Sequence, residues 1–344
     1  MTTQVGRDPA TTAAVEEFLN RPVTVGQRLQ QVLHKQPALS PAIVLVLAGI
    51  AFSLLSSRFY ALTNLSLVLQ QVAVVGSIAV GQTLIILTAG IDLSIGAVLV
   101  LSSLVMSKIV ADQGVPGPIA LLTGTAVAIL AQTLNGLLVT RIKLPPFIVT
   151  LGTLSIFTAI TLIYAKGETV QLTGGFLLWT ANSVSVGNLQ ITVGVFLMIV
   201  LYAAFGFALR YTAWGRHVYA VGDDAEAARL AGIQVNRVLL SAYMAAGIAI
   251  AVGAWILVGR VGGGDPNSGV NANLQSITAV VIGGTSLFGG RGRVLGTLIG
   301  ALIVQVFVNG LALAGYDPNY QVLAVGILVI AAVSVDQWIR SVKV

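Results

Sequence analysis

The residues of this chain that could carry out chemistry are few. Its 344 residues include no cysteine and two histidines, His34 and His217, which excludes a disulfide framework, a thiolate metal site and a cysteine nucleophile. Ser286 lacks a base, because both histidines fall outside the apolar stretches and a serine nucleophile needs a base within hydrogen-bond reach. No lysine follows a glycine, so the ATP-phosphate pattern G-x-x-x-x-G-K-[ST] is absent. We therefore expect no catalytic residue, no metal and no cofactor.

One carboxylate stands alone in an apolar region. Asp92 is the only acidic residue between positions 36 and 107, with Gly90, Ser94 and Gly96 around it. An ionisable group inside a membrane span is costly and usually functional. An Asp just before an apolar helical run is also typical of an N-cap, whose carboxylate accepts backbone N–H groups. We favour the cap, which could still matter for gating because the glycines supply the backbone freedom of a broken helix.

The most charged internal segment runs from residue 210 to residue 237. Asp223 is expected to cap a helix, with Glu226 three residues later returning the bond as in a capping box. AEAARLA strongly favours a helix of about two turns, which Gly232 ends. Because so short a helix is unstable alone, it must pack against something. It either lies on the rest of its own chain or docks on a partner.

The composition indicates that most of this chain lies in a lipid bilayer. Only 9% of the residues are charged, against roughly a quarter in soluble proteins, and the mean hydropathy is +0.93. A helix needs about 20 mostly apolar residues to cross a bilayer. We therefore predict an all-α, polytopic membrane protein of about ten transmembrane helices. The uncharged windows are 36–57, 59–91, 93–107, 113–140, 144–165, 169–209, 238–259, 266–290, 294–316 and 318–335.

The basic residues give the expected orientation. If the N-terminus is cytoplasmic, ten spans place both termini in the cytoplasm. Fourteen of the 18 basic residues then fall inside, and those outside are Arg58, Lys108, Lys166 and Arg260. This excess on the cytoplasmic side is the usual orientation signal. Residues 1–39 lack the apolar core of a signal peptide, so we expect a cytoplasmic tail there and a transmembrane domain at 40–340.

Three segments resemble one family of transporters. AVGDDAEAARLAGI at 220–233 looks like the coupling loop of the permease subunits of bacterial ABC importers for ribose, xylose, arabinose and fructose. TAGIDLSIG at 88–96 resembles that family's Gly-Ile-Asp-Leu-Ser signature, and AVVIGGTSLFGG at 279–290 resembles its Gly-Gly-Thr-Ser-Leu-x-Gly-Gly segment. The likeness runs in the same order from about residue 40 to the end.

The resemblance implies a multi-pass, non-enzymatic permease of the bacterial inner membrane that imports a monosaccharide. Its implied partners are a cytosolic ABC ATPase, a periplasmic sugar-binding protein, a second permease subunit and the lipid bilayer, with no nucleic acid. ATP-driven movement of the coupling helices would rock the spans between inward and outward access. The residues implied to contact the ATPase are Asp223, Asp224, Glu226, Ala227, Arg229, Leu230 and Gly232.

A small-residue cluster precedes Arg291 and Arg293. Small residues let membrane helices approach closely, so packing is the first interpretation. The position near the inner end of the eighth span also suits a hinge or a second contact with the ATPase. The cluster consists of Gly283, Gly284, Thr285 and Ser286, with Gly289 and Gly290 beyond it.

A sugar path would be lined by hydroxyl and amide groups. Membrane helices also use buried amides to hold one another, and both roles stay open for each residue. The path candidates are Gln71, Gln82, Asn135, Asn273 and Asn309. A wider set adds Gln70, Thr83, Gln132, Thr150, Thr278 and Gln305.

A secondary transporter of a small polar solute is the alternative, with Asp92 as its proton or cation site. A single carboxylate within the spans argues against it, and so does a capped cytoplasmic helix that a gradient-driven carrier does not need. A passive channel would not need that helix either.

Overall fold

The computed structural model describes residues 39–269 and 271–340. The predicted tail at 1–39 lies outside the described residues, apart from Leu39, where the first described helix begins. Most of the described chain is helical, as the composition predicts. In chain order the α-helices are α3 (Leu39–Leu55), α4 (Leu62–Leu87), α5 (Ile95–Gln113), α6 (Gly117–Thr140), α7 (Pro146–Ala165), α8 (Val193–Tyr211), α9 (Ala213–Asp223), α10 (Ala225–Leu230), α11 (Val235–Val261), α12 (Ala272–Ile282), α13 (Val294–Leu313) and α14 (Pro318–Arg340).

Seven of the described helices are long and apolar enough to cross a membrane, namely α4, α5, α6, α7, α8, α11 and α13. The apolar stretches of α3, α12 and α14 are shorter, at Pro41–Leu55, Ala272–Ile282 and Pro318–Ser334. Each of the ten predicted windows holds one of these ten helices. The polytopic helical prediction is confirmed for seven spans, and crossing by the three shorter helices stays a prediction.

Two small sheets qualify the all-α prediction. β1 (Val170–Gln171) pairs antiparallel with β4 (Gly263–Gly264), and β2 (Ser183–Val186) pairs antiparallel with β3 (Leu189–Thr192). The β2–β3 hairpin turns through two residues with Gly187 first, at φ +62°, the position where a type II′ turn needs glycine. A 3₁₀ helix, η1 (Phe176–Ala181), lies between the sheets in the chain. β1, η1, β2 and β3 lie between α7 and α8, and β4 lies between α11 and α12.

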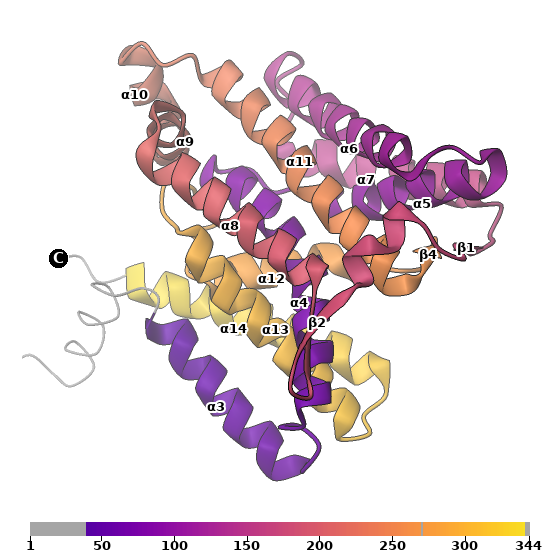
Figure 1. The fold of residues 1–344 in the computed structure, drawn as a ribbon. Coiled ribbons are helices and arrows are strands. Elements are labelled where there is room, and N and C mark those ends of the chain that lie inside the picture. Colours follow the sequence, from indigo (N-terminus) through magenta and orange to yellow (C-terminus); the bar gives the residue numbers. More distant parts are fainter. Residues whose placement is uncertain (1–38, 270, 341–344) are drawn as a thin grey trace, which may run out of the picture. The chain divides into compact units, whose positions relative to one another are not determined.

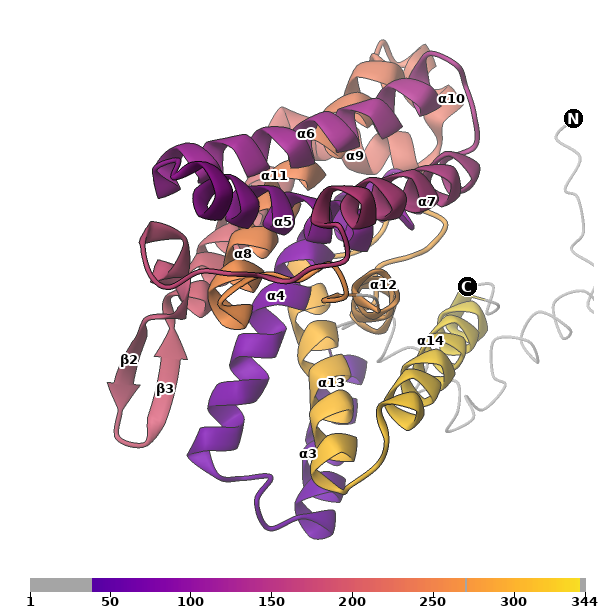
Figure 2. The same ribbon diagram turned by 90° about the vertical axis from the view of Figure 1, so that its right-hand side faces the viewer.

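Helices α4 and α11 form the centre of the bundle (Figures 1 and 2). In their most apolar windows 83% of α4 and 72% of α11 is buried, compared with 28% of α6 and of α7. The two central helices meet at Gly81, where an added Cβ would lie 3.2 Å from the Cα of Ala246. Small residues permit such close contact between membrane helices. The less buried α6 and α7 are left with apolar surface that suits lipid.

Two irregular segments interrupt the bundle. Residues 88–94 join α4 to α5, and residues 283–293 join α12 to α13. The cluster that begins at Gly283 was predicted near the inner end of a span, but it lies in the second segment because α12 ends at Ile282. α12 has 11 residues, about half of what a full crossing needs. Irregular backbone within a membrane protein is tolerated where protein buries it, and both segments contain buried polar side chains.

Candidate functional site

The charged segment 210–237 folds into two short helices instead of one. The hydroxyl of Thr212 caps α9, which ends at Asp223. Asp224 is the N-cap of α10 and accepts the backbone N–H groups of Glu226 at 2.9 Å and Ala227 at 3.0 Å. The cap predicted at Asp223 is therefore wrong by one residue, because α9 extends to that position. The predicted two-turn helix itself is present as α10.

Helix α10 exposes nearly all of its surface. Ala228 is its one buried side chain, whereas Leu230 is 81% exposed. Glu226 and Arg229 form an ion pair at 2.6 Å, which adds little stability at such exposure. Gly232 adopts φ +85° just beyond the helix, as a C-terminal glycine is predicted to do. The residues predicted to contact an ATPase are all exposed, namely Asp223, Asp224, Glu226, Ala227, Arg229, Leu230 and Gly232.

Three distant segments of backbone meet directly behind α10. The amide of Gly290 donates a hydrogen bond of 3.0 Å to the carbonyl oxygen of Leu87, the last residue of α4. A Cβ on Gly222, in α9, would collide with that same carbonyl group, and a Cβ on Gly290 would lie 2.7 Å from the Cα of Asp223. Gly290 has φ +68°, which residues with a side chain rarely adopt. We call the contact of Leu87, Gly222 and Gly290 the glycine junction.

The loop 283–293 is held by its own side chains and by α9. The hydroxyl of Ser286 accepts the amide of Phe288 at 3.1 Å, and the amide of Ser286 donates to the carbonyl of Arg291 at 2.8 Å. Tyr219 of α9 donates a bond of 2.9 Å to the carbonyl of Gly292. The hydroxyl of Ser286 thus shapes a turn, and the loop is fastened to the same helix that precedes α10.

The small residues at the start of this loop fill packing positions. Gly284 has φ +83° where α12 stops. A Cβ on Gly283 would collide with the backbone of Gly296 in α13. Thr285 is buried, and its hydroxyl has no hydrogen-bond partner within the described residues. The packing interpretation agrees with these contacts, while a hinge stays a prediction.

Asp92 lies in the other irregular segment and is fully buried. Its Oδ1 accepts the backbone N–H and the hydroxyl of Ser94, each at 2.7 Å, and its Oδ2 accepts the Gln132 amide at 2.8 Å. Asn135 donates to the Ser94 hydroxyl at 2.9 Å. Within the described residues no basic side chain forms an ion pair with Asp92. The carboxylate therefore links the start of α5 to α6 by hydrogen bonds alone.

The N-cap predicted at Asp92 needs a correction. The N-cap residue of α5 is Ser94, which lies two positions later and makes no capping bond through its own side chain. Asp92 still accepts a backbone N–H at the helix start, as a cap would, but it does so from outside the helix. Leu93 and Ser94 separate Asp92 from Ile95, where α5 begins.

The backbone beside Asp92 is fixed from both sides. Thr150 of α7 donates to the carbonyl of Ile91 at 3.0 Å, and Asn273 of α12 donates to the carbonyl of Leu93 at 3.3 Å. A Cβ on Gly96 would lie 3.0 Å from the backbone nitrogen of Asn273. At the other end, Gly90 donates to the carbonyl of Ile85 at 3.0 Å and closes α4. Segment 88–94 is thus bonded to α7 and α12, as well as to α6 through Asp92.

The polar path candidates occupy different environments. Asn309 exchanges two hydrogen bonds with Asn64, at 2.9 and 3.0 Å, and so links α13 to α4. Asn135 and Asn273 are bonded to the Asp92 segment. Gln82 is fully buried with neither amide atom partnered in the described residues, and the Oε1 of Gln71 is likewise unpartnered. Three of the five candidates therefore hold helices together, and whether any lines a path stays a prediction.

Sequence reasoning missed the residues of the glycine junction. Leu87 lies one position before the TAGIDLSIG segment, and Gly222 was seen only as part of the coupling motif. The pairing of both with Gly290 had no signal in the sequence, because a glycine does not reveal which backbone approaches it. Gln132 appeared only in the wider set of path candidates, although the structure places it on Asp92.

Comparison with known proteins decides the family. Residues 64–333 match the family described as branched-chain amino acid transport system / permease component. The chain belongs to this permease family. It is 48% identical over 325 residues to the fructose import permease of Rhizobium meliloti, covering 93% of this chain and 90% of the relative. It is 38% identical over 302 residues to the ribose import permease of Bacillus subtilis, covering 87% and 92%. No solved structure is significantly similar to this permease.

These relatives support the resemblance, noted in the sequence, to the permease subunits of bacterial ABC importers for monosaccharides. The D-allose transport system permease of Escherichia coli is 33% identical over 297 residues, covering 86% of this chain and 90% of the relative. Together with the seven long apolar helices, membership makes this permease a multi-pass protein of the inner membrane. Permeases of this kind work with an ATPase and a substrate-binding protein, and both partners are implied here.

Proposed function

We propose that this chain is the transmembrane permease subunit of an ATP-binding-cassette importer for a monosaccharide of the fructose or ribose kind. The proposal rests on relatives named as fructose and ribose import permeases, which align over most of both chains. The chain has no phosphate-binding lysine motif of its own, so a separate ATPase supplies the energy. The permease itself catalyses no reaction.

The observation that carries the energy coupling is the exposed helix α10. Its ion pair leaves one carboxylate and one guanidinium at the surface, beside the exposed apolar side chain of Leu230. Apolar contact with charged groups at its edge is typical of a protein interface. We infer that α10 sits in a groove of the ATPase, which orders a helix too short to be stable alone.

The glycine junction then carries movement from α10 into the membrane domain. Asp223 ends α9 and contacts Gly290, and Gly290 is bonded to the end of α4. Five residues beyond Leu87 lies Asp92, which is bonded to α6. A displacement of α10 therefore reaches α4 and the α5–α6 contact through packed backbone, which transmits rather than absorbs strain. Rigid-body rocking of the spans is the expected result.

We further propose ten spans with both termini in the cytoplasm. In Figures 1 and 2 the α6–α7 connection, which carries Arg141 and Lys143, lies at the same end of the bundle as α10. The α3–α4 and α13–α14 connections lie at the opposite end. Basic residues near α10 agree with a cytoplasmic position for that end.

The opposite end is proposed to meet a periplasmic sugar-binding protein. The exposed β2–β3 hairpin and the segment from Gly262 to Gly269 supply polar backbone and side chains there. A second copy of the permease is proposed to complete the pore, as the resemblance to paired permease subunits implies.

Reconstitution tests the function. The permease is placed in liposomes with the ATPase encoded beside it and with sugar-loaded binding protein outside, and uptake of labelled D-fructose and D-ribose is measured. We expect uptake that requires ATP inside and is unaffected by a protonophore. Uptake without the ATPase, abolished by a protonophore, would instead identify a secondary transporter.

A further inference from the structure

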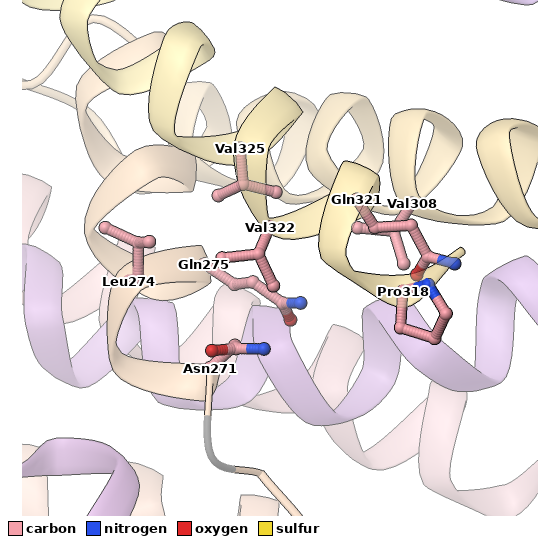
Figure 3. Close-up of a pocket in the computed structure, with 8 residues that line it drawn as sticks. All are labelled: Asn271, Leu274, Gln275, Val308, Pro318, Gln321, Val322 and Val325. Carbon is pink, nitrogen blue, oxygen red and sulfur yellow. The ribbon is translucent and has the colours of Figure 1, made fainter. Parts of the chain in front are cut away.

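A small pocket opens between the first turns of α12 and α14. It has a volume of about 70 Å³ and is closed from behind by Val308 of α13. Figure 3 shows the side chains of Asn271 and Gln275 at the start of α12, and that of Gln321 on α14 beside Pro318. Three amide side chains thus line the pocket, and its other lining residues are apolar.

The side-chain amides of this pocket form few hydrogen bonds to other protein groups. Gln275 accepts a hydrogen bond of 3.2 Å from the side chain of Gln305, which is itself buried. This bond positions Gln275 and leaves its own NH₂ group for another acceptor. In the described part of the chain the side chains of Asn271 and Gln321 make no hydrogen bond to protein. Each amide can both donate and accept.

The rest of the lining is apolar and uncharged. Leu274, Val322 and Val325 form the wall between the amides. Asp317, the nearest carboxylate in sequence, does not line the pocket, and it accepts the backbone amide of Asn319 at 2.8 Å. A lining of neutral amides and aliphatic side chains suits a neutral ligand that presents hydroxyl groups on its edge and C–H groups on its face. A monosaccharide has this chemistry, whereas an ion would find no opposite charge.

The position of the pocket agrees with a ligand that arrives from outside. In the proposed ten-span topology the segments before α12 and α14 both fall on the periplasmic side, the first of them following Arg260. Tyr316 and Tyr320, 50% and 56% exposed, lie edge to face with ring centroids 5.7 Å apart at the start of α14. Tyrosines of this exposure are enriched where a membrane meets water. The α14 side of the pocket thus lies toward the α13–α14 connection, at the end of the bundle opposite α10 (Figures 1 and 2).

The size of the pocket sets how a sugar can use it. Sites that enclose a small molecule occupy roughly 300–1,000 Å³, several times more than this pocket. It can therefore receive one edge of a sugar ring, with the remainder outside it. Partial enclosure gives the weak binding that a transport intermediate requires, because a solute held tightly at the mouth would not move on.

We propose that Asn271, Gln275 and Gln321 form a low-affinity docking site for the edge of a monosaccharide at the outer mouth of the permease. This inference rests on the proposed function and adds the residues that first receive the sugar from the binding protein. Gln305 is a positioning residue, since it acts through Gln275.

The absence of cysteine from the chain allows a direct test. Val322→Cys places a thiol in the pocket wall and keeps all three amides, and Asn319→Cys places one on the exposed surface three residues away. Each variant of the full chain, in intact cells, is labelled with a membrane-impermeant maleimide in the presence of D-fructose or of glycine betaine at equal osmolarity.

We expect D-fructose to slow the labelling of Val322→Cys by about twofold or more once its concentration reaches the Kd, because half of the sites are then occupied. Betaine should not slow it, and Asn319→Cys should react at the same rate in both solutes. Equal labelling of Val322→Cys in fructose and betaine would overturn the proposal. So would labelling of Asn319→Cys only in broken cells, which would place the pocket on the cytoplasmic side.

A second variant separates the pocket from the function. Gln275→Leu with Gln305→Leu removes the amide pair together, so that neither amide is left buried without a partner. In the Val322→Cys background this double change should abolish protection by fructose while the protein still captures its ATPase. Protection that persists would overturn the pocket proposal. The proposed function is scored separately, by ATP-dependent uptake in liposomes of the unchanged chain.

Discussion

The backbone amide of Gly290 and the carbonyl oxygen of Leu87 are joined by a hydrogen bond of 3.0 Å, although the two residues are about 200 positions apart. The bond connects the loop before α13 to the last turn of α4, the most buried of the described apolar helices. Gly222 lies against the same carbonyl group. Helix α9, the central helix α4 and the loop after α12 therefore share one contact.

The glycine junction gives the first prediction. Gly222→Ala forces a methyl group against the Leu87 carbonyl, and relieving such overpacking costs about 1–3 kcal/mol. We expect a folded permease that binds its ATPase but loses most sugar uptake, since α9 and α4 no longer fit. Gly206→Ala is the matched control, because no atom lies within 4 Å of a Cβ at that helical glycine. Normal uptake by Gly222→Ala would contradict transmission through the junction.

The charge order on α10 gives the second prediction. Glu226→Lys combined with Arg229→Glu keeps an ion pair within the helix but reverses the charges that a partner meets. We expect normal membrane insertion and loss of ATP-dependent uptake, because like charges would then face each other in the ATPase groove. Membrane insertion is measured by membrane fractionation, and ATP-dependent uptake is measured in liposomes. Uptake at the original rate would show that α10 does not dock through these groups.

Leu230 gives the third prediction. Leu230→Ala removes an apolar side chain whose burial at an interface contributes about 1–2 kcal/mol, which corresponds to roughly tenfold weaker binding of the ATPase. The thermal stability of the isolated permease should not change, because the side chain is 81% exposed. Leu54→Ala, at an 84% exposed position in α3, serves as the control and should bind the ATPase normally. Equal affinities for the two variants would refute the contact.

Asp92 gives the fourth prediction. Asp92→Asn can still accept the Ser94 amide, and Gln132 can turn its unpartnered Oε1 toward the new NH₂ group. We expect this variant to retain transport. Asp92→Leu should destabilise the protein, since Ser94 and Gln132 lose their acceptor, and each unpaired buried group costs about 1–3 kcal/mol. Thermal unfolding and uptake are measured for both. A well-folded Asp92→Asn with no uptake would favour a charge-carrying role.

The Asn64–Asn309 pair gives the fifth prediction. Variants of this pair test whether it only links α4 to α13 or also lines the sugar path. Asn309→Leu alone leaves Asn64 buried without its partner and should lower the midpoint of thermal unfolding in detergent. The double change to Leu at both positions should recover much of this loss, because replacing both partners by apolar groups is nearly neutral. Uptake should follow stability in both variants. A stable double variant without uptake would place the pair on the sugar path.

Much of the architecture follows from the sequence because lipid imposes a simple rule. A helix in the bilayer satisfies its own backbone groups. The length of the uncharged windows was therefore enough to locate the ten apolar helices. The motif at 220–233 identified α10. Local chemistry was nearly sufficient for its boundaries: Gly232 ends the helix as predicted, and the cap was displaced by one residue, to Asp224.

Contacts between distant segments were decided only by the tertiary structure. Nothing in the residue types pairs Gly290 with Leu87 or Gly222, because glycine contributes no side chain by which a partner could be recognised. Gln132 could equally have faced a sugar path, and only the packing of α6 against the start of α5 turns it onto Asp92. Apolar periodicity and capping act over a few residues, whereas these contacts join residues brought together by the packing of whole helices.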